Sequence, residues 1–162
     1  MNIAQKIISL QNLVSKVQEL KKQNKKIVAT NGAFDLLHVG HLEVLEKSKL
    51  LGDILIVGIN SDNSVKQSKS DIRPIISDVE RARLVAALTC VDYVTIFDEK
   101  DPVTFLRTVK PDIYTKGGDY TLEQNMAADF VRENVGEVQI IPGRIQSTTA
   151  IIEKILKTHP SK

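Results

Sequence analysis

Two of the chain's three histidines, His38 and His41, lie three residues apart at the start of a predicted helix. This spacing places both imidazole rings on one face of the first turn, where main-chain amides have no partner within the helix. Free amides and the positive end of the helix dipole attract anions, so phosphate is the predicted ligand. Gly40 removes a side chain where that ligand would approach the backbone. On these residues alone two alternatives stay open: a zinc site with Asp35 as a third ligand, and a pair of buried structural histidines.

A polar turn precedes the two histidines, in the segment Thr30-Asn31-Gly32-Ala33-Phe34-Asp35 that ends a predicted strand. A turn around Gly32 exposes main-chain N–H groups, as phosphate-binding loops do. Taken alone, the segment fits an ordinary strand-to-helix turn with Phe34 in the core. Next to His38 and His41, it favours a phosphate-binding loop.

A lysine and two glycines follow the fourth predicted strand, in the segment Lys116-Gly117-Gly118-Asp119-Tyr120. Lys116 comes directly after this apolar strand and before two glycines, which places it better than most lysines to contact a phosphate or a sugar. Asp119 would bind a hydroxyl group or cap the turn. The last predicted helix begins with three hydroxyl side chains, those of Ser147, Thr148 and Thr149. Such residues are ordinary helix N-caps, and together with free amides they also form a site for phosphate or ribose.

The segment 64–74 follows the second predicted strand, carries three cationic side chains and has no apolar periodicity. The plain interpretation of this segment is an exposed loop. Its position would also let it fold over a bound triphosphate as a lid. In that case Lys66 and Arg73 are favoured over Lys69 as the phosphate contacts.

The elements that must position these residues alternate between strands and helices. Apolar runs rich in Ile and Val predict strands at 27–31, 54–60, 93–97, 112–115 and 137–141. Caps and apolar spacing predict helices at 39–51, 77–88, 101–109, 122–134 and 148–157, after an amphipathic N-terminal helix at 3–20. The alternation predicts an α/β fold with an open five-stranded parallel sheet and helices on both faces. Ligands of such sheets bind where the strands end, and all the polar segments lie there.

Length and composition describe one ordinary globular domain of 162 residues, with an N-terminal helix and connector at 1–25 and the main domain at 26–162. A net charge of +2 is too balanced for nucleic-acid or membrane-surface binding driven by bulk charge. Cys90 is the only cysteine, which excludes an intramolecular disulfide and fits a reducing compartment. Because the sequence has no secretory signal and no apolar run of about 20 residues, a cytoplasmic protein is expected.

The motifs, in this order, resemble those of a known enzyme family. The polar turn with His38-Val39-Gly40-His41 is similar to the H-x-G-H signature of the cytidylyltransferase-like nucleotidyltransferases, which have a Rossmann-like α/β fold. The Lys116-Gly117-Gly118-Asp119-Tyr120 and Ser147-Thr148-Thr149 segments resemble the adenylyltransferase domain of heptose 1-phosphate biosynthesis, found alone or fused to a sugar kinase. The resemblance covers roughly residues 26–157.

The resemblance implies transfer of AMP from ATP to D-glycero-β-D-manno-heptose 1-phosphate, giving ADP-heptose and pyrophosphate. The sugar phosphate would attack the α-phosphorus in line with the leaving pyrophosphate, with no covalent enzyme intermediate and with Mg²⁺ bridged by the triphosphate. Catalytic contacts are assigned to His38, His41 and Lys116. With the ordinary histidine pKa of about 6.5, either imidazole would carry a proton when triphosphate is bound. Nucleotide and phosphate contacts are assigned to Thr30, Asn31, Gly32, Phe34, Gly40, Lys66, Arg73, Arg81, Gly117, Gly118, Asp119, Ser147, Thr148 and Thr149.

The family also sets expectations beyond the pocket. Arg81 resembles a family arginine that reaches pyrophosphate oxygens. A sugar kinase would not fit in 162 residues, so a separate kinase is expected to supply the sugar phosphate. Family members are commonly homodimers, and a homodimer is expected here. Ala33, where a cysteine is common, and Arg144-Ile145-Gln146 before the last helix depart from the family pattern.

Other functions stay open at the level of the sequence. Within the same class, the acceptor would be glycerol 3-phosphate with CTP, or another small phosphate such as flavin mononucleotide with ATP. A non-catalytic nucleotide-binding module is a second class. A protein-interaction module that works through the amphipathic helix at 3–20 is a third.

Overall fold

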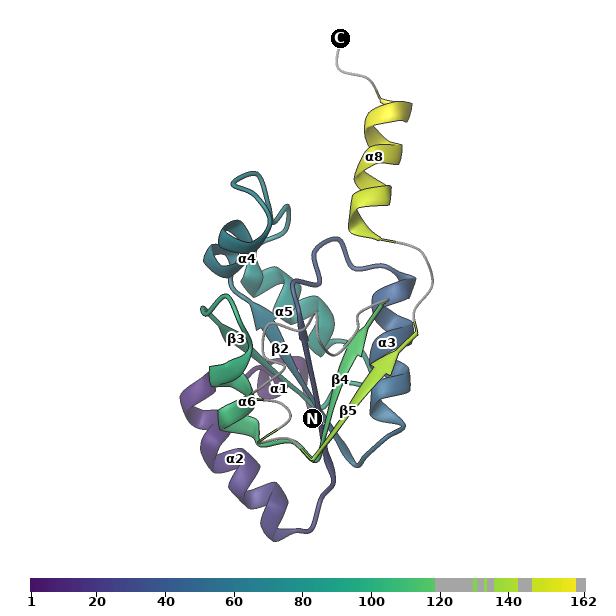
Figure 1. The fold of residues 1–162 in the computed structure, drawn as a ribbon. Coiled ribbons are helices and arrows are strands. Elements are labelled where there is room, and N and C mark those ends of the chain that lie inside the picture. Colours follow the sequence, from purple (N-terminus) through teal and green to yellow (C-terminus); the bar gives the residue numbers. More distant parts are fainter. Residues whose placement is uncertain (119–129, 131–132, 134–135, 143–146, 160–162) are drawn as a thin grey trace.

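Five parallel strands form the centre of the computed structural model, which describes residues 1–118, 130, 133, 136–142 and 147–159 (Figure 1). Their order in the sheet is β3-β2-β1-β4-β5. The strands are β1 (Ile27–Gly32), β2 (Ile54–Asn60), β3 (Tyr93–Phe97), β4 (Ile113–Gly117) and β5 (Glu137–Ile141). Ile27 of β1 lies beside Ile54 of β2, and Val28 beside Ile113 of β4. The predicted open parallel sheet is confirmed.

Helices cover both faces of this sheet, as predicted. They are α1 (Ile3–Lys6), α2 (Leu10–Lys22), α3 (Val39–Lys49), α4 (Asp62–Ser68), α5 (Asp78–Ala86), α6 (Val103–Val109) and α8 (Thr148–Thr158). The α2 and α6 helices pack together on one face, α3 and α5 lie on the other, and α8 extends away from the sheet (Figure 1). Within the described part of the chain, no helix is both long and apolar enough to cross a membrane. The predicted helix at 122–134 falls almost entirely outside the described residues.

The core consists of two apolar layers, because successive side chains of a strand point to opposite faces of the sheet. On β1, Ile27 packs with Leu13 of α2 and Phe105 of α6. Its neighbour Val28 packs with Leu45 of α3 in the other layer. The N-terminal helices therefore belong to the same packed unit as the sheet, while the expected boundary between residues 25 and 26 stays a prediction.

The single helix predicted at 3–20 is wrong, because the chain forms two helices with an extended break between them. At the break, Ile7 forms a parallel bridge to Val94 of the edge strand β3, and the N–H of Ile8 donates to the main-chain O of Val94 at 2.9 Å. Pairing with the sheet edge satisfies main-chain groups that a helix would have used internally. The apolar spacing continues through the break, so periodicity alone does not reveal it.

The segment predicted as an exposed loop at 64–74 also differs, because its first part belongs to α4. The hydroxyl of Ser61 accepts a hydrogen bond from the N–H of Ser64 at 3.1 Å and so caps the helix. Val65 is the one buried apolar side chain of α4, which is why the segment shows no apolar period. The helix ends at Ser68, and the rest of the segment leads to α5.

Candidate active site

A pocket of about 350 Å³ opens at the carboxyl ends of β1 and β4. The strand order changes direction here, because the chain places β2 and β3 on one side of β1 and β4 and β5 on the other. Ligands of open parallel sheets bind at such a switch point. Most of the predicted contact residues line the pocket: Thr30, Asn31, Gly32, Phe34, His38, Gly40, His41, Lys116, Gly117, Gly118, Ser147, Thr148 and Thr149.

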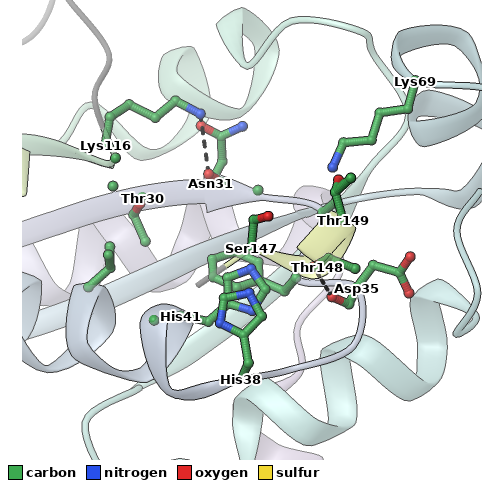
Figure 2. Close-up of a pocket in the computed structure, with 17 residues that line it drawn as sticks. Thr30, Asn31, Asp35, His38, His41, Lys69, Lys116, Ser147, Thr148 and Thr149 are labelled. Carbon is green, nitrogen blue, oxygen red and sulfur yellow. Dashed lines mark hydrogen bonds between the residues drawn. The ribbon is translucent and has the colours of Figure 1, made fainter. Parts of the chain in front are cut away.

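The rings of His38 and His41 are stacked at the start of α3, with their centroids 3.8 Å apart and their planes at 21° (Figure 2). Phe34 packs against His41, with 5.3 Å between the ring centroids. Both ring nitrogens of His38 and Nδ1 of His41 are buried without a hydrogen-bond partner among the described residues. Buried polar atoms without partners are costly, and an anion bound in the pocket would accept hydrogen bonds from them.

Burial lowers the pKa of His41 to about 4, and the charges of His38 and Lys69 act in the same direction. Burial also lowers the pKa of His38. Burial therefore favours the neutral form of both imidazoles, whereas protonation beside a bound triphosphate stays a prediction. A neutral imidazole still donates one N–H hydrogen bond, and a phosphate anion beside it raises its pKa.

The turn between β1 and α3 has a backbone conformation that most side chains avoid. Phe34 and Leu36 have φ angles of 50° and 47°, in a region that costs of order 1–3 kcal/mol for each such residue. Asp35 lies between them and is 1% exposed. Its carboxylate accepts hydrogen bonds from Nε of Arg73 at 2.9 Å and from the N–H groups of Ile75 and Ile76 at 3.0 Å. These bonds hold the strained turn against the segment that precedes α5.

The first residues of α8 form another side of the pocket. Ser147 caps the helix by accepting from the N–H of Ala150 at 3.2 Å, and Thr148 donates to the main-chain O of Asp35 at 2.7 Å. The second bond ties α8 to the strained turn. Figure 2 shows Lys69 pointing toward Thr149. A helix N-terminus with hydroxyl groups and a lysine suits an anion of high charge.

Lys116, near the end of β4, enters the pocket from another side (Figure 2). Burial lowers the pKa of its ammonium group to about 8. Gly117 follows it and must lack a side chain, because a Cβ at this position would lie 2.5 Å from Cγ2 of Val44 on α3. This close contact between β4 and α3 forms the wall of the pocket beside Lys116.

The sequence profile of a family described as cytidylyltransferase-like matches residues 29–159, which include all the pocket residues named above. The chain belongs to the cytidylyltransferase-like family. The match confirms the resemblance carried by the H-x-G-H motif, and it makes this chain a member of a family of nucleotidyltransferases.

Individual relatives of this cytidylyltransferase-like chain agree with the family match. Two curated proteins named "Bifunctional protein HldE" are 48% identical over 157 residues, in Geobacter metallireducens, and 49% identical over 154 residues, in Helicobacter pylori strain P12. Each alignment covers 95% of this chain and 32% of the relative, so the chain spans about a third of their length.

Two solved structures have the same fold as this cytidylyltransferase-like chain. The lipopolysaccharide core biosynthesis protein of Thermoplasma volcanium is 28% identical with a TM-score of 0.62, over 76% of this chain and 99% of that one. The pantoate-β-alanine ligase of Francisella tularensis has a TM-score of 0.64 at 19% identity, over 86% of this chain and 67% of that one, and shows the fold alone.

The cations favoured on the segment 64–74 lie differently from the prediction. Lys66 is exposed on α4 and does not line the pocket, whereas Lys69, the first residue after α4, does. Arg73 does not line it either, because its Nε is bound to Asp35. The sequence signal that could have identified Lys69 is the N-cap residue Ser61. A short helix predicted from this cap would end near Lys69, beside the pocket. Asp119, the other predicted contact, lies outside the described residues.

Arg81 of α5 is fully buried and is not among the residues that line the pocket, so its predicted contact with pyrophosphate stays a prediction. Its guanidinium donates to three main-chain oxygens and one carboxylate. These are the oxygens of Ile76 at 2.9 Å, Asn60 at 2.9 Å and Ala33, and Oδ1 of Asp62 at 2.7 Å. These bonds use four of the five N–H groups of Arg81 and tie the β1–α3 turn to α5 from outside the pocket.

The pocket contains one carboxylate among the described residues, that of Asp35, and its bonding makes it a poor metal ligand. Burial acts to raise its pKa, but the hydrogen bonds from Ile75 and Ile76 and the charge of Arg73 outweigh this and hold the pKa below its usual value. Nor do three His, Cys, Asp or Glu side chains come together anywhere in the described residues as a metal site requires. A resident metal held by protein side chains does not fit this part of the chain.

Proposed function

We propose that this protein transfers the adenylyl group of MgATP to D-glycero-β-D-manno-heptose 1-phosphate, releasing pyrophosphate and ADP-heptose. The observation that carries the proposal is the stacked histidine pair, which lines a pocket at the switch point of the sheet and has three buried ring nitrogens without a partner among the described residues. The similarity to the bifunctional HldE proteins along nearly the whole chain supports the heptose acceptor.

The proposed reaction needs positioned donors and no protein base. A phosphate monoester has a second pKa of about 6, so the acceptor is largely a dianion at neutral pH and can attack without losing a proton to the enzyme. One of its oxygens forms a bond to the α-phosphorus as the bond to the bridging oxygen of pyrophosphate breaks. His38 and His41 would donate to the oxygens of the transferring phosphoryl group, where negative charge grows.

The leaving pyrophosphate would occupy the side of the pocket formed by Lys69 and the start of α8. This group carries the most charge in the reaction, and here a helix N-terminus and a cation lie together. Because Asp35 is engaged with Arg73, we expect Mg²⁺ to arrive on the triphosphate as part of the substrate. A separate sugar kinase and a homodimer remain part of the proposal.

Pyrophosphate release by the purified protein tests this reaction directly. ATP and CTP would each be paired with β-heptose 1-phosphate, its α-anomer, glycerol 3-phosphate and flavin mononucleotide, all with Mg²⁺. We expect release with ATP and the β-anomer alone. Release only with CTP and glycerol 3-phosphate would show that the proposed substrates are wrong and that the proposed nucleotidyl transfer is right. No release with any pair would favour a nucleotide-binding module without catalysis.

Replacing Lys69 with alanine should raise the KM for MgATP by about 10- to 100-fold, because a charge-assisted contact to the pyrophosphate portion is lost. Lys66→Ala is the matched control, since Lys66 lies three residues away and is exposed outside the pocket. Steady-state rates with varied MgATP would measure both. If Lys66→Ala had the larger effect, the triphosphate would pass on the other side of α4 and the assignment of Lys69 would be wrong.

A further inference from the structure

Two lysines line the pocket among the described residues, and they come from different parts of the fold. Lys69 follows α4, and Lys116 lies near the end of β4. Figure 2 shows their ammonium groups on opposite sides of the view, with the rings of His38 and His41 between and below them. In this view the histidine pair lies between the two cations.

The surroundings of Lys116 lack the anion that a buried ammonium group requires. Among the described residues its Nζ donates one hydrogen bond, at 3.3 Å to the main-chain O of Asn31, lies 6.0 Å from the centre of the Tyr114 ring and makes no ion pair. Lys116 is half-buried, and desolvation of its ammonium group lowers its pKa to about 8. Burying a cation without a counter-charge destabilises the fold, so an anionic ligand is the expected partner.

Asn31 lies beside Lys116 and is itself held in place. The hydroxyl of Tyr114 donates to Oδ1 of Asn31 at 2.6 Å, inside the core. Figure 2 shows the amide group of Asn31 beside the end of the Lys116 side chain, with its nitrogen Nδ2 pointing away from the ammonium group. Together the two side chains offer an ammonium and an amide donor, which suit the oxygens of a phosphate group.

We propose that Lys116 and Asn31 bind the phosphate group of the acceptor and hold it for attack on the nucleotide. The inference rests on the proposed function, because it uses the geometry of an in-line displacement. The attacking oxygen and the leaving oxygen lie on opposite sides of the transferring phosphorus. With that phosphorus at the histidine pair and pyrophosphate beside Lys69, the attacking phosphate lies on the side of Lys116.

This assignment places the phosphate, and not the sugar ring, at the buried end of the acceptor site. The phosphate is common to every sugar 1-phosphate, so Lys116 and Asn31 would set the requirement for a phosphate dianion. Selection of the sugar would then fall to residues farther from β1 and β4. Hexose 1-phosphates should accordingly depend on Lys116 to the same degree as the heptose, even where they bind more weakly.

The test compares Lys116→Met with Lys69→Met, because methionine keeps most of the volume of lysine and removes its charge. Calorimetry would measure binding of MgATP and, separately, of β-heptose 1-phosphate to each full-length protein. We expect Lys116→Met to weaken the sugar phosphate by about 10- to 100-fold and MgATP by less than about 2-fold. Lys69→Met should show the reverse pattern. The unfolding temperature of Lys116→Met should not fall, because the variant removes a partly buried charge that has no counter-charge among the described residues.

Equal weakening of both ligands by Lys116→Met, or weakening of MgATP alone, would overturn the assignment. So would a wild-type protein that binds no sugar phosphate. If the wild type binds β-heptose 1-phosphate but releases no pyrophosphate, the proposed reaction is wrong. Comparing the affinities of the wild type and Lys116→Met for β-heptose 1-phosphate would still test whether Lys116 binds its phosphate group. The binding measurements thus separate failure of this inference from failure of the proposed function.

Discussion

Replacing His41 with alanine should lower kcat for pyrophosphate release by about 100- to 1,000-fold, the effect typical of losing one donor to a group that gains charge in the transition state. The effect should fall on kcat more than on the KM for MgATP, because charge at the transferring group grows only as the reaction proceeds. Rates with saturating MgATP and acceptor would measure it. The prediction follows from the position of His41, stacked on His38 and against Phe34 at the start of α3.

The third histidine of the chain supplies the matched control for this variant. His159 is exposed just after α8 and does not line the pocket, so His159→Ala should retain wild-type kcat. The unfolding temperature of each variant would show that the fold survives. If His41→Ala kept wild-type kcat while only MgATP binding weakened, His41 would be a ground-state contact and the chemical role would pass to another group.

The site could be located from the sequence because its position follows from a rule about sheets. Each strand is a short apolar run, and polar residues follow directly where the run ends, as at Asn31 and Lys116. Parallel strands bring these ends to one edge. The pairing of β1 with β4, although 85 residues separate Val28 from Ile113, then joins them in one pocket.

The choice between neighbouring cations could not be made in the same way. Lys66 and Lys69 are three residues apart, and which of them reaches the pocket depends on where α4 ends. That helix is held by the Ser61 cap and has one buried apolar side chain, Val65, so it has no apolar period to detect. The break in the N-terminal helix at Ile7 could not be predicted for a related reason. It is caused by pairing with the edge strand β3, which leaves no signal in the local sequence.

The surroundings of Arg81 could not be predicted from the sequence for a different reason, because they come from separate parts of the chain. Its predicted contact with pyrophosphate rests on its resemblance to a family arginine near the start of a capped helix. Its acceptors follow β1 at Ala33, end β2 at Asn60 and precede α5 at Ile76. No local pattern links these oxygens, and only the packed structure brings them to one guanidinium group.

Replacing Arg81 with methionine should lower the free energy of unfolding by about 3–5 kcal/mol, the usual cost of removing one member of a buried charged network. Methionine fills part of the space but leaves buried main-chain oxygens unpaired, including that of Ala33 in the turn before His38. Denaturation with urea would measure the loss. Arg83→Ala, two residues along α5 and exposed, should change stability by no more than about 0.5 kcal/mol.

The same variant separates a positioning role for Arg81 from direct contact with pyrophosphate. Arg81 touches the pocket only through the turn that follows β1, so a folded Arg81→Met protein at low temperature should bind MgATP weakly because that turn is loose. The loss of affinity should then track the loss of stability as temperature or urea is varied. Wild-type stability combined with a large loss of MgATP affinity would contradict this and return Arg81 to the ligand. The Arg83→Ala protein should keep the stability and the MgATP affinity of the wild type. Because both variants remove one positive charge from α5, a loss seen only in Arg81→Met would come from the position of Arg81 and not from the charge of the helix.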